Sequence, residues 1–130
     1  MDENTQKPPK VLIIEDDSFL GDLLLDHVQK SGINASLCRD AESAFEEIKK
    51  EPPTLLLTDL LLPGMDGYDL LRKLKEINIL DQIKVIVLSN LSQTEKIQEG
   101  IDLGVKDFLG KSNFDLDDIT KRVQEVLAAK

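Results

Sequence analysis

The chain has 130 residues, of which 41% are apolar and 32% are charged, which is the size and composition of one ordinary globular domain. Its 25 acidic residues outnumber the 16 lysines and arginines and give a formal net charge of −9, so the surface repels the phosphates of nucleic acids. No apolar run approaches the length of a membrane span, and the single cysteine, Cys38, cannot form an internal disulfide. We therefore expect a cytoplasmic domain that binds neither nucleic acid nor membrane.

The first residues differ from the rest of the chain. Residues 1–9 are polar and end in Pro8-Pro9, which predicts a disordered N-terminal tail, and residues 10–130 form the expected domain. Beyond the tail, short apolar runs alternate with longer stretches in which apolar residues recur at helical spacing. Strands are predicted at 11–14, 33–37, 54–58, 83–88 and 105–109, and helices at 18–30, 41–50, 68–77, 92–103 and 115–129.

The predicted order is a strand followed by a helix, repeated five times. The first strand, Val11 to Ile14, is apolar throughout, as is usual for a strand that is buried on both faces. Ser18 and Asp40 are suited to cap the first two helices. Neighbouring parallel strands need crossover connections, and these connections are right-handed. The order therefore predicts an α/β fold, a doubly wound five-stranded parallel sheet with helices on both faces.

Polar residues follow the predicted strands at the points where the strands end. In open α/β sheets, ligands bind beyond the carboxyl ends of the strands, so we expect these side chains to converge at one edge of the sheet. In the order of their strands, the residues are Glu15, Asp16 and Asp17, then Asp59, then Ser89 and Asn90, and finally Lys111.

This set of side chains is suited to phosphoryl transfer. Several carboxylates held close together repel one another, and Mg²⁺, which prefers oxygen ligands, relieves the repulsion. A carboxylate can also act as a nucleophile and form an aspartyl phosphate. A lysine neutralises phosphoryl oxygens as a point charge, and a hydroxyl group donates a hydrogen bond to them. The edge therefore contains the groups needed to transfer a phosphoryl group to an aspartate.

Four segments carry a resemblance to a known family. They are residues 11–17 (Val-Leu-Ile-Ile-Glu-Asp-Asp), 55–67, 85–89 and 107–111, and the stretch from Asp59 to Gly67 is the most specific. With these segments the chain resembles the response-regulator receiver domains of two-component signalling, from about residue 10 to residue 127. The resemblance implies a flavodoxin-like (βα)5 fold with strand order 2-1-3-4-5.

The resemblance also implies a role for each residue at the edge. Asp59 would be the phosphoacceptor, Lys111 would pair with the phosphoryl oxygens, and Ser89 would hold the phosphoryl group and move on activation. Phe108 is at the position of the aromatic switch residue, whose rotamer is coupled to the shift of Ser89. The implied Mg²⁺ ligands are Glu15 (directly or through water), Asp16, Asp59 and the backbone carbonyl of Leu61.

The implied partners are two kinds of protein. The phosphoryl donor would be the phosphohistidine of a sensor histidine kinase or of a histidine phosphotransfer protein. Phosphorylation would bias a two-state equilibrium and change the surface formed by residues 92–129, which would bind a downstream protein. The domain would assist its own Mg²⁺-dependent phosphotransfer and dephosphorylation without being an enzyme otherwise, and we expect a stand-alone receiver.

Several positions depart from the family pattern. Asn90 stands where a small residue is usual, and Ser112 stands where the family has proline, usually after a cis bond. A cis bond without proline costs roughly 2.5–4 kcal/mol, so we expect a trans bond or a strained loop here. Phe108 replaces tyrosine and therefore has no hydroxyl group. Leu61 and Leu91 stand two residues after Asp59 and Ser89, where side chains of the family often flank the path by which water reaches the phosphoryl group, and two leucines there predict its slow loss.

Other functions are less well supported. Asn90 and Ser112 would suit a protein-interaction module that keeps the fold but is not phosphorylated. A Mg²⁺-dependent phosphatase with an aspartate nucleophile carries a second aspartate two residues later, where Leu61 stands here. Flavin binding is disfavoured because residues 15–17 would repel the phosphate. His27 lies among polar neighbours, and we expect it to face solvent.

Overall fold

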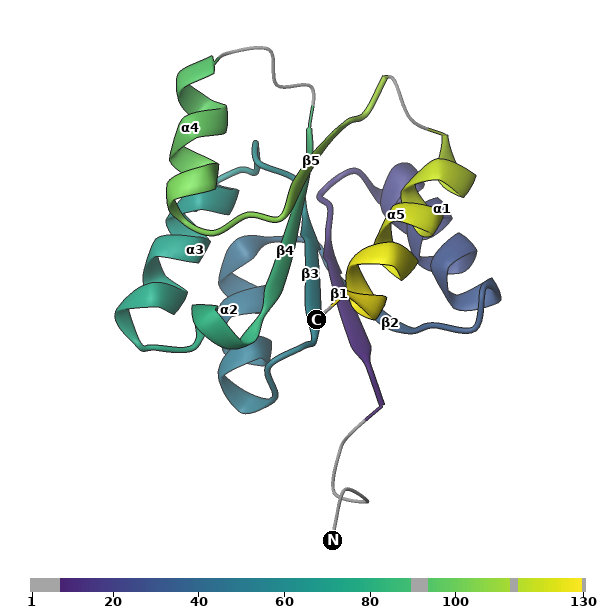
Figure 1. Ribbon diagram of the computed structural model, residues 1–130, viewed down its shortest axis with the longest axis horizontal. Coiled ribbons are helices and arrows are strands. Elements are labelled where there is room, and N and C mark those ends of the chain that lie inside the picture. Colours follow the sequence, from purple (N-terminus) through teal and green to yellow (C-terminus); the bar gives the residue numbers. More distant parts are fainter. Residues whose placement is uncertain (1–7, 90–93, 113–114, 130) are drawn as a thin grey trace, which may run out of the picture.

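A computed structural model describes residues 8–89, 94–112 and 115–129 of the protein. Its five strands form one parallel sheet in the order β2-β1-β3-β4-β5 (Figure 1), which confirms the predicted fold class and strand order. The strands are β1 (Lys10–Ile14), β2 (Asn34–Cys38), β3 (Leu55–Thr58), β4 (Lys84–Ser89) and β5 (Asp107–Gly110). The helices are α1 (Ser18–Lys30), α2 (Ala41–Lys50), α3 (Gly67–Glu76), α4 (Thr94–Asp102) and α5 (Leu116–Ala128), with a short 3-10 helix, η2 (Leu80–Gln82).

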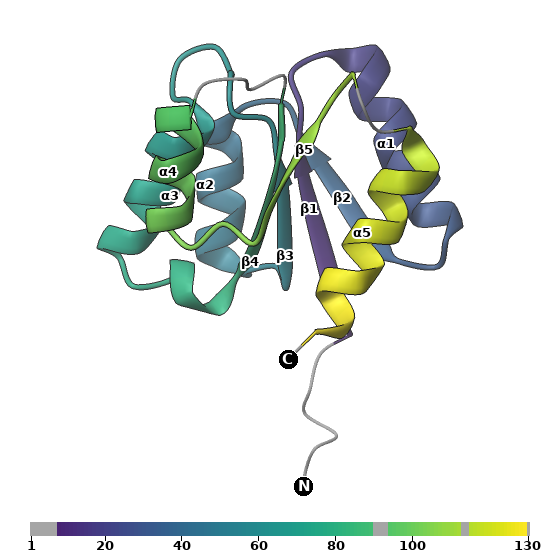
Figure 2. The ribbon, with the colours of Figure 1, turned by 45° about the horizontal axis from the view of Figure 1, so that its top comes forward.

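The helices cover both faces of the sheet (Figure 2). Helices α1 and α5 lie on one face, and α2, α3 and α4 lie on the other. Side chains of the central strands alternate between the two faces, so that Val11 and Ile13 pack with α1 and α5, and Leu12 and Ile14 pack with α2 and α3. Both sets are buried, which explains why β1 is apolar at every position from Val11 to Ile14. In the described part of the chain, no helix combines the length and the apolar character needed to cross a bilayer.

The helix starts differ slightly from the predicted ones. Asp17, not Ser18, caps α1, because its carboxylate accepts a hydrogen bond from the Leu20 N–H at 3.0 Å. The prediction for the second helix is confirmed, since Asp40 caps α2. Helix α3 begins one residue before its predicted start. Residues 1–7 of the predicted tail and the predicted first two residues of the fourth helix, 92–93, lie outside the described residues.

His27 joins the two helices on one face of the sheet. Its Nδ1 atom lies 2.9 Å from the hydroxyl oxygen of Thr120, and its Nε2 atom lies 2.8 Å from a carboxylate oxygen of Asp117. Both partners belong to α5, whereas His27 belongs to α1. The expectation that His27 faces solvent was wrong, because the side chain is half-buried between the helices.

Candidate functional site

The backbone itself places the acidic residues at the carboxyl edge of the sheet. The hydrogen-bond ladder continues one residue beyond β1 and β3. Glu15 donates its N–H to the Cys38 carbonyl at 3.1 Å, and Asp59 donates its N–H to the Ile14 carbonyl at 3.1 Å. These two acidic residues therefore start from adjacent, fixed backbone positions, and their side chains do not depend on a long loop for their placement.

Three carboxylates meet at this edge. Carboxylate oxygens of Glu15, Asp16 and Asp59 all lie within 4.8 Å of one another. Glu15 is 1% exposed and Asp59 is 5% exposed, whereas Asp16 is exposed to solvent. Two buried carboxylates side by side are costly unless a cation faces them. The predicted convergence of residues far apart in the sequence is thus what the structure shows.

Lys111 is the cation that faces the two buried carboxylates. Its ammonium donates a hydrogen bond to Asp59 Oδ2 at 2.6 Å and lies 2.9 Å from Glu15 Oε1. The contact with Glu15 is an ion pair, and among the described residues no other group lies within hydrogen-bond reach of Oε1. Burial by itself lowers the Lys111 pKa, but the two carboxylates outweigh it, and the pKa is raised above its usual value. Lys111 therefore stays charged at physiological pH.

Glu15 is the least solvated group of the site. Burial raises its pKa above the usual value, and the neighbouring charge of Asp59 raises it further. The Lys111 ammonium and the Asp17 N–H, which donates to Oε2 at 3.1 Å, act in the opposite direction. A buried carboxylate oxygen that, among the described residues, faces only the Lys111 ammonium is a group that a metal ion would also satisfy.

Of the remaining predicted residues, Leu61 contacts Asp59 and Ser89 contacts Lys111 through the backbone. The Leu61 N–H donates to Asp59 Oδ1 at 3.2 Å, which places the Leu61 peptide beside the carboxylate, while the Leu61 side chain is 69% exposed. Ser89 is buried at the end of β4, and its carbonyl accepts the Lys111 N–H at 3.2 Å. The bond between Lys111 and Ser112 is trans, one of the two outcomes that the sequence allowed. Asn90 and Leu91 lie outside the described residues, and Phe108 is half-buried beside α4.

Gly67 is required where α3 begins, because the chain passes directly over Asp59. A Cβ atom at Gly67 would lie 2.6 Å from the Asp59 carbonyl oxygen and 3.1 Å from Leu60 Cα. Both obstacles are backbone atoms that cannot move aside. We expect Gly67→Ala to lower the free energy of unfolding by about 2 kcal/mol, measured by urea denaturation. Gly21→Ala is the matched control, since its Cβ would meet side-chain ends, Arg39 at 2.8 Å and Leu37 at 3.3 Å, and no backbone atom closer than 3.5 Å. An equal loss in both variants would contradict the explanation.

Sequence reasoning missed the residue that holds the loop after Asp59. Glu42, at the start of α2, accepts the Met65 N–H at 3.2 Å through Oε2. The same oxygen would be 2.9 Å from a Cβ atom at Gly64, whose φ of +75° favours glycine. The two partners are 23 positions apart, so no local pattern in the sequence indicates the contact.

The donor set fits a hard divalent cation. It consists of carboxylate oxygens at one edge, with a lysine that neutralises only part of their charge, and Mg²⁺ is bound by one or two carboxylates together with water. Mg²⁺ is therefore expected to raise the melting temperature of the wild-type protein.

Glu15→Gln is expected to weaken Mg²⁺ binding roughly tenfold, measured by calorimetric titration. Glu46→Gln makes the same change on the exposed surface of α2, and equal affinities in the two variants would exclude Glu15 from the site.

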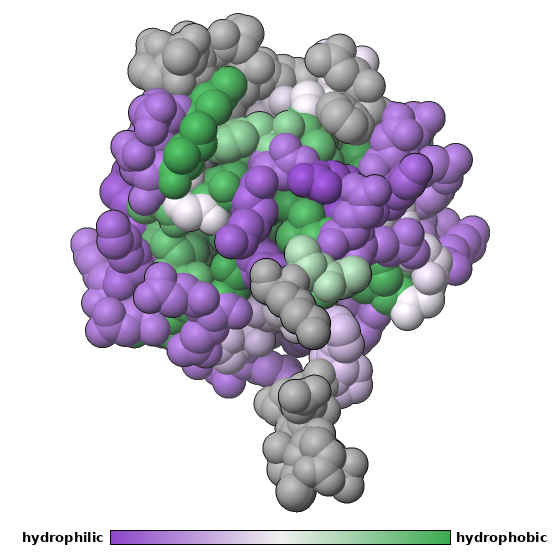
Figure 3. All heavy atoms as spheres, in the orientation of Figure 1, coloured by the Kyte–Doolittle hydropathy of each residue, from purple (hydrophilic) through white to green (hydrophobic). Residues whose placement is uncertain are grey.

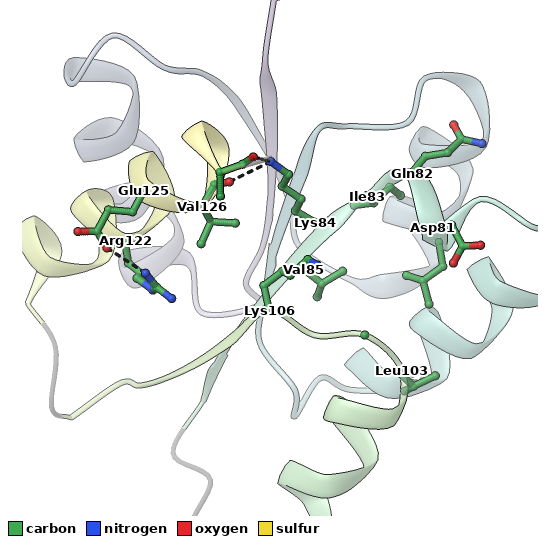
Figure 4. Close-up of a pocket in the computed structure, with 13 residues that line it drawn as sticks. Asp81, Gln82, Ile83, Lys84, Val85, Leu103, Lys106, Arg122, Glu125 and Val126 are labelled. Carbon is green, nitrogen blue, oxygen red and sulfur yellow. Dashed lines mark hydrogen bonds and ion pairs between the residues drawn. The ribbon is translucent and has the colours of Figure 1, made fainter.

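A separate hollow lies at the opposite end of the strands. It has a volume of about 490 Å³ and lies where β4 starts, beside the last turns of α5 (Figure 4). Lys84 points to α5 there and donates to the carbonyl oxygens of Val126 and Ala129, while Arg122 pairs with Glu125. These cations already have partners within the protein, and the hollow is distinct from the edge that carries Asp59.

The fold and the edge together define a class of protein. A doubly wound sheet that holds a buried aspartate, an acidic cluster and a lysine at its carboxyl edge is the arrangement of a phosphoacceptor domain. The sequence profile of the response regulator receiver domain matches residues 11–124. The chain belongs to this family, and it is a phosphoacceptor signalling domain of the two-component type.

Individual relatives agree with this assignment. Sporulation initiation phosphotransferase F of Bacillus subtilis is 32% identical over 121 residues, which cover 93% of this chain and 95% of the relative. Transcriptional regulatory protein BaeR of Escherichia coli is 30% identical over 98% of this chain but only 50% of its own length. This chain thus spans about half the length of several curated relatives that it matches.

Solved structures give the same result. The receiver domain of Francisella response regulator 1452 has a TM-score of 0.82 and 31% identity, with 92% of this chain and 96% of that chain covered. The BeF3-activated N-terminal receiver domain of Klebsiella pneumoniae RstA has a TM-score of 0.80 and 26% identity, with 92% and 99% covered.

Proposed function

We propose that the domain accepts a phosphoryl group from a phosphohistidine onto Asp59 and passes the signal on through a changed protein-binding surface. The observation that carries this proposal is the ammonium of Lys111, held between Asp59 and Glu15 at 2.6 and 2.9 Å. A buried aspartate that faces a fixed cation beside a set of metal-suited oxygens is placed for charge-neutralised phosphoryl transfer.

The transfer step needs few groups from the protein. A carboxylate oxygen of Asp59 would attack phosphorus while the bond from phosphorus to the histidine nitrogen breaks, and that nitrogen keeps the bonding pair. Lys111 would move from the carboxylate to a phosphoryl oxygen, and the Ser89 hydroxyl would donate a hydrogen bond to another. Mg²⁺, held by Glu15, Asp16, Asp59 and the Leu61 carbonyl, would neutralise negative charge on the reacting oxygens.

The surface around Asp59 suits a protein donor. Phe19, in the first turn of α1, is 75% exposed, and Leu23 lies one turn further along the same helix. The exposed Leu61 side chain belongs to the loop that follows Asp59. We expect the phosphohistidine-bearing kinase or phosphotransfer protein to dock on these apolar side chains, because α1 and the loop of Leu61 follow β1 and β3 at the carboxyl edge that carries Asp59.

The output surface would be formed by α4, β5 and α5. Apolar atoms lie on the α4 side of this face among hydrophilic neighbours (Figure 3), and Ile101 of α4 is 52% exposed. A downstream protein, rather than a nucleic acid, suits a chain with a net charge of −9.

We place the transfer of the phosphoryl group and the binding of the downstream protein in the cytoplasm. The domain would catalyse its own Mg²⁺-dependent phosphorylation and dephosphorylation only, and the exposed Leu61 would slow the loss of the phosphoryl group.

Intact-mass measurement with acetyl phosphate tests the proposal. The wild-type protein is expected to gain one phosphoryl group in the presence of Mg²⁺ and none after chelation of the metal. If neither acetyl phosphate nor a panel of phosphorylated histidine phosphotransfer proteins changes the mass, the domain is an interaction module that keeps the receiver fold without its chemistry.

A further inference from the structure

Tyr68 joins helix α3 to helix α4 through a buried hydroxyl group. The side chain is 1% exposed, and its hydroxyl donates a hydrogen bond to the Lys96 carbonyl of α4 at 2.5 Å. Burial raises the pKa of the phenol, and the charge of Glu99 adds to the effect, so the hydroxyl remains a donor at neutral pH. The position of α4 on the protein therefore depends on a residue that belongs to α3.

Gly100 shows how closely α4 rests on two aromatic rings. A Cβ atom at Gly100 would lie 2.5 Å from the Tyr68 hydroxyl oxygen and 2.6 Å from Phe108 Cζ. The lack of a side chain at this position lets the ring from α3 and the ring from β5 contact the same turn of α4. Phe108 itself has no hydroxyl group, so the polar contact at this turn comes from Tyr68.

Tyr68 is also close to the phosphoacceptor along the backbone. The preceding residue, Gly67, donates its N–H to the Leu60 carbonyl at 2.9 Å and is packed against the carbonyl of Asp59. A shift of the turn at Asp59 and Leu60 would therefore displace the backbone that carries Tyr68. One short path of direct contacts runs from Asp59 through Gly67 and Tyr68 to α4.

We propose that Tyr68 is a positioning residue that holds α4 in its unphosphorylated position and releases it when Asp59 is phosphorylated. The proposal rests on the proposed function of Asp59. In the described arrangement Lys111 donates directly to Asp59 Oδ2 at 2.6 Å, and the hydrogen bond from Tyr68 to Lys96 is present at the same time. The proposal assigns both contacts to the resting side of the equilibrium, where the Tyr68 hydrogen bond would oppose the change of the output surface.

The test is Tyr68→Phe, which removes one hydroxyl group and keeps the ring. Beryllofluoride with Mg²⁺ serves as the phosphoryl probe, and hydrogen exchange of the α4 amides reports the position of the helix. We expect faster exchange in residues 96–102 of the probe-free variant, unchanged exchange in the loaded variant, and beryllofluoride binding about fivefold tighter than in the wild type. Ser31→Ala is the control, since Ser31 also donates a hydroxyl hydrogen bond to a helix carbonyl, that of Val28, far from α4.

A purely structural role of Tyr68 gives a different result. Faster exchange of α4 in both the free and the loaded variant, or beryllofluoride binding that is unchanged or weaker, would overturn the proposal. The wild-type protein separates this failure from failure of the proposed function. If the wild type gains no phosphoryl group and binds no beryllofluoride, phosphorylation at Asp59 is wrong, and the role of Tyr68 in releasing α4 is withdrawn with it.

Discussion

Asp59→Asn is expected to abolish phosphoryl uptake from acetyl phosphate and from any phosphohistidine donor, because an amide oxygen does not serve as the nucleophile. The fold is expected to survive. The substitution removes the attraction between the Asp59 carboxylate and Lys111. It also removes the repulsion of that carboxylate by Glu15 and Asp16 and the cost of burying its charge. We therefore expect the free energy of unfolding without metal to stay within about 1 kcal/mol of the wild-type value. Intact mass and urea denaturation measure the two effects.

Asp66→Asn is the matched control for this experiment. Asp66 belongs to the same loop and caps α3, with its carboxylate accepting the Asp69 N–H at 2.8 Å. Asparagine caps helices about as well as aspartate, so the stability and the phosphoryl uptake of this variant should both stay near wild type. If Asp59→Asn still gains a phosphoryl group at the wild-type rate, another residue is the phosphoacceptor.

The fold and the edge were predictable because both follow from simple patterns. A continuously apolar run such as Leu55 to Leu57 of β3 requires a sheet covered on both faces, and the strand-helix order then fixes parallel pairing. Parallel strands end at the same edge, so acidic residues placed just after β1 and β3 must meet. Asp59 and Glu15 are therefore brought together by topology alone, although 44 positions separate them.

The details that the sequence did not reveal depend on contacts between elements. The hydrogen bond from Tyr68 to Lys96 spans 28 positions, and the one from Met65 to Glu42 spans 23, with no periodic pattern at either end. Gly67 ends the most specific stretch of the resemblance, but only the path of the chain over Asp59 shows why a side chain is excluded there. At the start of α1, two neighbouring residues are both suited to cap the helix, so composition could not decide between Asp17 and Ser18.

Lys111→Met is expected to lower the free energy of unfolding by about 3 kcal/mol in the absence of metal, because it leaves two buried carboxylates without their cation. Mg²⁺ is expected to restore much of the loss, since it supplies positive charge to the same oxygens. Urea denaturation with and without Mg²⁺ measures both effects. Lys106→Met is the control, because that lysine is exposed just before β5 and its loss should change stability by less than about 0.5 kcal/mol.

The loss of stability in Lys111→Met should also depend on pH through Glu15. Burial already raises the pKa of Glu15, and Lys111 lowers it, so removing the lysine raises the pKa further. A carboxyl group whose pKa is higher in the folded than in the unfolded protein binds more protons when folded, and stability then falls as the pH rises through that interval. The variant should therefore be closer to wild type at pH 5 than at pH 8. If the variant loses the same free energy of unfolding at pH 5 and at pH 8, Glu15 finds another partner when Lys111 is removed. Lys111 is then not the group that keeps the buried Glu15 carboxylate charged.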